Sequence, residues 1–515
     1  METDEGALSA PLFLCHDDAQ MTARTDPIPP RGLKGRWLIV AIAAWLGADQ
    51  LLLWRFLAMP GWSIVVGGGM LAGFLAWLFR AARPMPRIGT GALVIGFAAA
   101  FVLMLLGGEG RFFYANIDWQ ARYAILRDMS LYPWPFVYTS RGLPELLRGP
   151  IGMFFAPALA AKALGARAGD IALLLQNSLL TGALLALGST LFDTRRAKLT
   201  ALAIVILFSG LDAMGRIMFR GGLSDHLENW AYLQFSSTIT LAFWVPPHAI
   251  SGWVGALGFL LWRGGKLPLG PFLALLPLTA LWSPLGLIGA MPFAALAAIR
   301  TLIARALRTR DIALPALSSL IALPGLFYLS AAGGEVGARL RTVAPIQWAV
   351  FELLEVLVYV APLALLVRHP RLGRDTLAVL TGWLLFVPFA QIGFSSDFPM
   401  RASISALAIL AAMVADAVST APRARPILLG LIAIGSITGF MEVRRALIHP
   451  AAPQVRCGLF QAWDQSFGDF PVSSYVAPLS AVPAIVRPAD PAQVVPPRPA
   501  RCWDGHWYSP DEASG

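Results

Sequence analysis

Long apolar stretches alternate with short polar, arginine-rich segments along most of the chain. About twenty apolar residues in a helix suffice to cross the hydrocarbon core of a bilayer. Residues 37–57, 62–79 and 89–106 are the first three such stretches. The dyad alternation of a membrane β-barrel is absent, so the pattern predicts an all-α polytopic membrane protein with about thirteen transmembrane helices.

The remaining predicted spans lie between residues 170 and 441. They cover 170–192, 199–210, 247–262, two segments that meet at Trp282-Ser-Pro284, 312–329, 348–367, 376–392, 404–420 and 427–441. Residues 151–164 are apolar but short. We expect them to form a juxtamembrane or re-entrant helix, which is acceptable where it packs against protein.

Basic residues fall mostly in alternate loops, which is the positive-inside pattern. Arg31, Lys34 and Arg36 precede the first span, so the N-terminus is predicted to be cytoplasmic. The predicted parts are a disordered cytoplasmic tail (1–35), a transmembrane domain (36–442) and an external C-terminal tail (443–515). Within the domain, residues 108–168 form a first large outer loop and residues 212–245 a second.

Composition supports this class. The chain of 515 residues is 57% hydrophobic and only 14% charged, too little charge for the surface of a soluble protein. The net charge of +10 lies in the loops between spans, so we do not expect a nucleic-acid partner. The P-loop, GxSxG, HExxH and CxxC motifs are absent, which disfavours an ATP-driven pump.

The longest polar interruption in the first half of the chain is residues 108–150. Asp118 and Arg122 are four residues apart, and so lie on one face of a helix. We expect an amphipathic helix on the outer membrane surface that ends at Tyr132-Pro-Trp-Pro135. A purely interfacial helix with an ion pair and aromatic anchors is the alternative to a functional site.

Further acids and histidines occur in the later outer loops. Asp212 ends a short span, and Ser224-Asp-His-Leu-Glu-Asn-Trp230 follows it with His226 and Glu228. Side chains of these types act as acid–base groups or as metal ligands. The alternative is a solvated loop without a functional site. His248 either binds the substrate or caps the following helix. Asp397 and Arg401 form either a substrate-binding pair or a structural ion pair. Cys457 and Cys502 lie in the external tail, where a disulfide is expected.

The layout resembles the GT-C superfamily of membrane glycosyltransferases. The resemblance rests on an acid in the first outer loop (Asn116-Ile-Asp-Trp119), a juxtamembrane helix ending in Lys162-Ala-Leu-Gly165, a basic turn (Asp193-Thr-Arg-Arg-Ala-Lys198) and a further outer acid. It implies transfer of a sugar from a polyprenyl-phosphate-linked donor to a saccharide, lipid or protein acceptor of the cell envelope. The reaction would take place at the outer face of a bacterial cytoplasmic membrane.

The resemblance also implies roles for residues. Asp118 takes the position of the catalytic carboxylate, and Asp212 is a second acid that orients the acceptor or a divalent cation; whether a cation is needed stays open. Cations must bind the phosphate. The expected substrate-binding residues are Arg111, Arg122, Arg127, His226, Glu228, His248, Arg339, Asp397 and Arg401.

Two alternatives remain. An envelope polysaccharide polymerase or ligase would depend on Arg339, Arg341, His226 and His248 rather than on Asp118. A lipid or solute transporter would show matched repeats and broken helices in mid-membrane.

Overall fold

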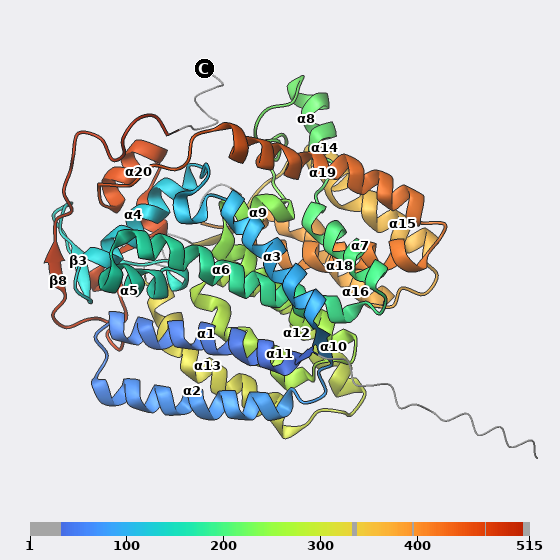
Figure 1. The fold of residues 1–515 in the computed structure, drawn as a ribbon, viewed down its shortest axis with the longest axis horizontal. Helices are drawn as coiled ribbons and strands as arrows, with labels where there is room; N and C mark the ends of the chain where they lie inside the picture. The colour runs from blue at the N-terminus through green and yellow to red at the C-terminus, as the bar shows by residue number, and fades with distance from the viewer. Residues whose placement is uncertain (1–31, 332–336, 394–395, 469, 508–515) are drawn as a thin grey trace, which may run out of the picture.

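The computed structural model describes residues 32–331, 337–393, 396–468 and 470–507, and the fold is predominantly helical (Figure 1). Most of the predicted cytoplasmic tail, residues 1–31, lies outside the described residues. Its last part forms strand β1 (Gly32–Lys34), which pairs antiparallel with β2 (Arg87–Gly89).

Eight helices in the described part of the chain are long and apolar enough to cross a membrane. They are α1 (Gly35–Phe56), α2 (Gly61–Ala81), α6 (Ala166–Gly188), α7 (Arg195–Leu207) continued by α8 (Asp212–Arg220), α12 (Pro284–Ile303), α13 (Thr309–Leu329), the segment α14 (Pro345–Glu352) to α15 (Val358–Leu366), and α19 (Arg425–Ile448). The protein is therefore a multi-pass membrane protein.

Shorter helices complete the bundle. They are α3 (Thr90–Leu106), α5 (Phe155–Leu164), α9 (Thr238–Trp244), α10 (Pro246–Arg263), α11 (Leu269–Leu275), α16 (Arg374–Phe386), α17 (Asp397–Ala402) and α18 (Ile404–Thr420). Each predicted span thus coincides with helical structure, while the count of thirteen crossings stays a prediction. The segment around α5 is too short to cross a bilayer, as expected.

Helix α2 shows how these helices pack. Its exposed face carries large apolar side chains, and the face toward α1 carries a small residue. On α2, Trp62 and Val65 are 70% and 76% exposed, which is typical of a surface that faces lipid. On its opposite face, a Cβ on Gly67 would lie 2.4 Å from the ring of Trp54. Glycine at this position lets α1 and α2 approach closely, as small residues do between membrane helices.

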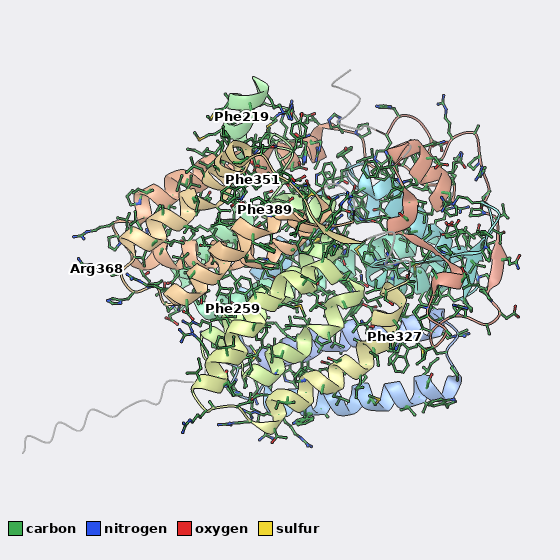
Figure 2. All side chains as sticks on the ribbon, turned by 180° about the vertical axis from the view of Figure 1, so that it is seen from behind. Phe219, Phe259, Phe327, Phe351, Arg368 and Phe389 are labelled. Atoms are coloured by element: carbon green, nitrogen blue, oxygen red, sulfur yellow. A yellow bond between two sulfur atoms is a disulfide. The ribbon has the colours of Figure 1, made fainter. Side chains whose placement is uncertain are left out.

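The arginine-rich loops gather at one end of the bundle, here named the basic end. Arg263, at the end of α10, forms an ion pair of 2.7 Å with Asp375 at the start of α16. Arg371 pairs with Asp416 of α18 at 3.0 Å. Arg368 lies at the left edge of the view in Figure 2. The loops predicted to be cytoplasmic are thus neighbours, although the direction of insertion stays a prediction.

The opposite end, here named the sheet end, carries the part of the fold that sequence patterns missed. Four short strands form a mixed sheet in the order β7-β4-β3-β8. They are β3 (Phe136–Tyr138), β4 (Glu145–Leu147), β7 (Val476–Pro478) and β8 (Ala492–Val494). Because β7 and β8 come from the C-terminal tail, the tail is an integral part of this end, and the expected boundary at residue 442 falls inside α19.

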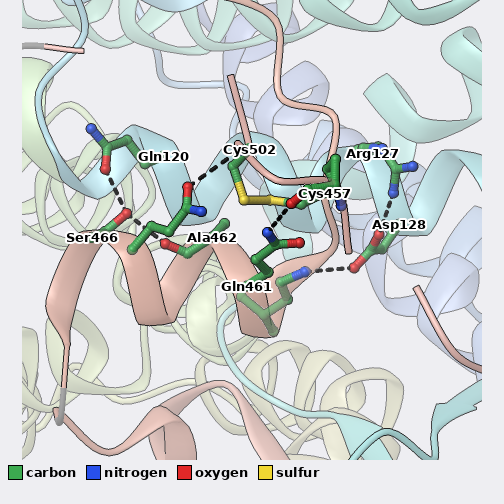
Figure 3. Close-up of a disulfide and its surroundings, with 11 residues drawn as sticks. Gln120, Arg127, Asp128, Cys457, Gln461, Ala462, Ser466 and Cys502 are labelled. Carbon is green, nitrogen blue, oxygen red and sulfur yellow. Dashed lines mark hydrogen bonds and ion pairs between the residues drawn. A yellow bond between two sulfur atoms is a disulfide. The ribbon is translucent and has the colours of Figure 1, made fainter. Parts of the chain in front are cut away.

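The tail also covers the first predicted outer loop. Helix α20 (Leu459–Phe467) packs against α4 (Asp118–Leu131), and a disulfide joins Cys457 to Cys502 as expected (Figure 3). The burial of α4 contradicts both the expected amphipathic helix on the membrane surface and the alternative of an interfacial helix with aromatic anchors. Trp119 is fully buried, ten of the fourteen residues of α4 are buried, and α4 packs against α5 and α20.

Candidate functional site

Helix α4 begins at the acid that the sequence singled out. The backbone N–H of Asp118 donates to Asn116 Oδ1 at 3.1 Å, which turns the chain into the helix. One turn later, Arg122 Nη2 donates to Asp118 Oδ2 at 2.8 Å, as the spacing of four residues predicts. The Arg122 side chain is only 3% exposed, whereas that of Asp118 is 25% exposed. The carboxylate is therefore the accessible member of the pair.

The junction between α9 and α10 holds this end of α4 in place. The carbonyl of Phe243 accepts hydrogen bonds from Asn116 Nδ2 and Trp119 Nε1, each at 2.8 Å. The next carbonyl, of Trp244, accepts from Arg122 Nη1. Three side chains from the first loop thus bind two consecutive carbonyls at the end of α9, and this fixes Asp118 relative to the bundle.

A second ion pair comes from α17. Arg401 Nη1 donates to Asp397 Oδ1, again at a spacing of four residues. Burial lowers the pKa of Arg401, but the carboxylates of Asp397 and Asp118 more than offset this and raise it, so Arg401 stays charged. Its buried Nε has no hydrogen-bond partner among the described residues. One donor of the Arg401 guanidinium is therefore left unpaired beside the two carboxylates.

His248 and Tyr475 complete this group. His248, near the start of α10, bonds Ser283 Oγ through Nδ1 at 2.7 Å and interacts electrostatically with Arg401 and Arg122. Burial raises the pKa of Tyr475, and its hydroxyl lies within electrostatic reach of both ion pairs. We name this group the Asp118 cluster; its members are Asp118, Arg122, His248, Asp397, Arg401 and Tyr475.

Sequence reasoning had selected the first five members of this cluster but missed Tyr475. This residue directly precedes β7, and only the pairing of β7 with β4 brings the C-terminal tail to the site. No local pattern around Tyr475 signals that pairing.

Asp212 belongs to a separate, buried group. It is 1% exposed and accepts hydrogen bonds from Ser209 Oγ at 2.8 Å and Thr438 Oγ1 at 3.1 Å. Glu355, on the π-helical turn Leu353–Leu357, shares a hydrogen bond with it. The predicted second acid is therefore bound into the protein interior instead of facing a substrate beside Asp118.

Glu228 and His226 also serve internal contacts. Burial raises the pKa of Glu228 to about 7, and its carboxylate accepts from the backbone N–H of Ser237 at 2.8 Å. His226 Nδ1 lies 2.9 Å from Glu442 Oε1. These residues hold the second predicted loop against α9 and α19, which favours a structural role over the expected substrate contact.

Three predicted phosphate-binding arginines have other partners. Arg111 pairs with Asp170 of α6, and Arg127 pairs with its neighbour Asp128 at 3.1 Å. Arg339, on the exposed strand β5 (Ala338–Leu340), bonds Gln391 Oε1 at 3.3 Å. None of them joins the Asp118 cluster through a contact of the described residues.

Asp212, the acid expected to orient the acceptor or a divalent cation, contacts Ser209, Thr438 and Glu355 instead of the Asp118 cluster. Among the described residues there is also no group of three or more His, Cys, Asp and Glu side chains arranged to hold a metal ion. The Asp118 cluster offers two carboxylates, those of Asp118 and Asp397, and each is already paired with a guanidinium. These residues do not fit a metal centre, so we assign no step to one.

The Asp118 cluster combines a partly exposed carboxylate with guanidinium groups and a histidine. A positioned carboxylate can accept a proton, and a guanidinium with a free donor can bind a phosphate oxygen. No family model, no curated protein and no solved structure matches this chain.

Proposed function

We propose that the protein is a membrane glycosyltransferase that moves a sugar from a polyprenyl-phosphate donor to an envelope acceptor, with the Asp118 cluster as its active site. The observation that supports this most is the difference in solvent exposure between Asp118 and the arginines beside it. Asp118 is accessible, whereas the arginines beside it are largely buried and held in place by carboxylates and carbonyls. A fixed cation next to an accessible base suits a reaction whose leaving group is a phosphate.

In the proposed reaction, the Asp118 carboxylate accepts the proton of an acceptor hydroxyl. The acceptor oxygen forms a bond to the anomeric carbon, and the bond from that carbon to the phosphate oxygen breaks. Polyprenyl phosphate leaves with the electron pair, and the positive charge of the Arg401 guanidinium stabilises the negative charge that develops on it. Arg122 positions the Asp118 carboxylate through their ion pair.

The test measures release of polyprenyl phosphate, which is common to every acceptor. Purified protein in lipid nanodiscs is incubated with polyprenyl-phosphate mannose, glucose or arabinose and an extract of envelope acceptors. Asp118→Asn is expected to lower the release rate at least about 100-fold, the usual contribution of a general base. Asp464→Asn, an exposed acid of α20 outside the cluster, is the matched control and should keep the wild-type rate.

Because Asp118 is partly exposed, Asp118→Asn should fold normally, and an unchanged melting temperature will show this. Turnover by Asp118→Asn at the wild-type rate would rule out the assignment of the base. Absence of release by the wild-type protein with all three donors would count against the proposed activity.

The polymerase or ligase alternative receives no comparable support. Arg339 and Arg341 bond Gln391 and the carbonyl of Pro388, while His226 and His248 bond Glu442 and Ser283. These four side chains contact four different sets of partners. We therefore place the active site at Asp118.

A further inference from the structure

An apolar groove runs along the bundle away from the Asp118 cluster. Its volume is about 390 Å³, within the range of roughly 300–1,000 Å³ that small-molecule sites occupy. Helices α3 and α6 form one wall, α7 forms the other, and α10 and α18 form the floor. Ile95 and Leu199 line it and are still 38% and 42% exposed, so the groove opens sideways toward the lipid.

The two ends of this groove differ. At the sheet end, α9 packs against both α3 and α7, and Thr238 of α9 is the lining residue there. At the basic end, the lining includes Arg195 and Lys198 of α7 and Gly89 of β2. A hydrocarbon chain in the groove therefore has its tip under α9 and its polar head at the basic end.

Helix α7 presents cations and apolar side chains on the same face. Arg195 and Lys198 are three residues apart, and Leu199 and Leu202 continue this face along the groove. Neither cation forms an ion pair among the described residues, although Asp193 lies nearby in the sequence. From Arg195 to Ile206 the apolar face extends roughly 16 Å at the rise of an α-helix.

The wall opposite α7 offers one polar group. Thr181 of α6 is 2% exposed, and its hydroxyl has no hydrogen-bond partner among the described residues. Buried hydroxyl groups are nearly always paired, so a free one that lines a cavity suits a ligand with an acceptor oxygen. The ester oxygens of a glycerolipid are such acceptors.

We propose that this groove is a binding site for an anionic glycerophospholipid, with one acyl chain between α3 and α7 and the phosphate at Arg195 and Lys198. Apolar walls select a hydrocarbon chain, and the two cations at the open end select negative charge over a zwitterionic headgroup. The proposal does not rest on the proposed glycosyl transfer, because none of the residues that line the groove belongs to the Asp118 cluster.

The experiment is native mass spectrometry of the purified full-length protein in detergent, titrated with phosphatidylglycerol or phosphatidylethanolamine. We expect the wild-type protein to bind phosphatidylglycerol more tightly. The double variant Arg195→Ala/Lys198→Ala should bind it roughly 30-fold more weakly, given the usual contribution of two juxtamembrane cations. The matched control is Arg368→Ala/Arg423→Ala, which removes two exposed cations from the basic end outside the groove.

A second pair of variants tests the apolar part without changing charge. A Cβ at Gly91 would meet no atom within 4 Å, so Gly91→Leu can fold normally while its side chain enters the groove. It should abolish binding of phosphatidylglycerol. Gly73→Leu on α2 also has open space, lies outside the groove and should leave binding unchanged.

Equal binding of the two phospholipids, or equal loss in the groove variants and their controls, would overturn the proposal. Displacement of phosphatidylglycerol by an equimolar amount of polyprenyl phosphate would overturn it too, and would assign the groove to the substrate. Glycosyl transfer is measured separately with Asp118→Asn, so failure of one proposal is distinguishable from failure of the other.

Discussion

Arg122 and Glu442 bind opposite parts of the same residue, Trp244. Arg122 Nη1 donates to the Trp244 carbonyl, and the Trp244 indole N–H donates to Glu442 Oε2 at 2.9 Å. Glu442 belongs to α19 and Arg122 to α4, so Trp244 connects the proposed active site to a helix of the bundle. Both side chains are buried, which makes their hydrogen bonds costly to lose.

The first prediction tests this connection. Trp244→Phe should lower the free energy of unfolding by about 1–3 kcal/mol, because it removes one of the two hydrogen bonds that buried Glu442 Oε2 accepts and leaves only the one from Arg445. A double-mutant cycle that combines Trp244→Phe with Glu442→Gln measures the coupling energy between the two side chains. Stability is followed by thermal melting in detergent. We expect a coupling energy of about 0.5–3 kcal/mol, whereas additive effects would mean that the indole contact contributes nothing.

The second prediction concerns the disulfide between Cys457 and Cys502, which closes a loop with a sequence separation of 45. The loss of both cysteines (Cys457→Ser/Cys502→Ser) should cost about 4 kcal/mol by loop-closure entropy. Limited proteolysis should then cleave the C-terminal tail well before the helical bundle. Cys15→Ser is the control, and cleavage at the same rate in both variants would contradict a stabilising role.

The third prediction concerns pH and Asp128, whose carboxylate accepts from Tyr138 Oη and from the backbone N–H of Leu459, each at 2.9 Å. Burial raises its pKa from 3.8 to about 6. The folded state thus binds this proton more tightly than the unfolded state. Its contribution to stability is fully present below about pH 4 and is lost as the pH rises through 6, a change of about 3 kcal/mol.

Asp128→Asn keeps the acceptor oxygen but cannot ionise. Relative to this variant, the melting temperature of the wild-type protein should fall between pH 4 and pH 7. Glu228 also titrates near pH 7, but it is present in both proteins and its effect cancels. A difference between the two melting temperatures that does not change with pH would contradict the assignment.

The fourth prediction tests how α12 positions the second ion pair. A Cβ at Gly289 would lie 2.3 Å from the carbonyl oxygen of Ala402, at the end of α17. Gly289→Ala must therefore displace α17, which carries Asp397 and Arg401, and should cost about 1–3 kcal/mol. Gly68→Ala on α2, where a Cβ meets no atom within 4 Å, should be neutral or slightly stabilising. Equal melting temperatures of both variants would exclude this close packing.

The features that the sequence predicted are those with a local cause. An apolar run of sufficient length predicts a helix wherever it occurs, and both ion pairs of the cluster have a spacing of four residues. The end of α4 at Leu131 follows from the prolines just beyond it.

What could not be predicted depends on contacts between distant segments. The carbonyl that binds Arg122 lies 122 residues away, and Asp170, which holds Arg111, lies 59 residues away. Strands of three residues are too short for an alternating pattern, so the sheet gave no signal in the sequence. The burial of α4 could not be predicted from the sequence either. Helix α20, which covers it, comes from the end of the chain.

The parallel pairing of Val137 with Gln493 also has a consequence for biosynthesis. At the usual synthesis rate of about 5–20 residues per second, β3 leaves the ribosome roughly 20–70 s before β8 is made. Until β7 is made, β3 and β4 can pair only with each other, and both outer edges of that hairpin are open. The Asp118 cluster therefore becomes complete only after the segment with Tyr475 has been made, and a nascent chain that ends after α19 still lacks Tyr475 and the cover that α20 gives to α4.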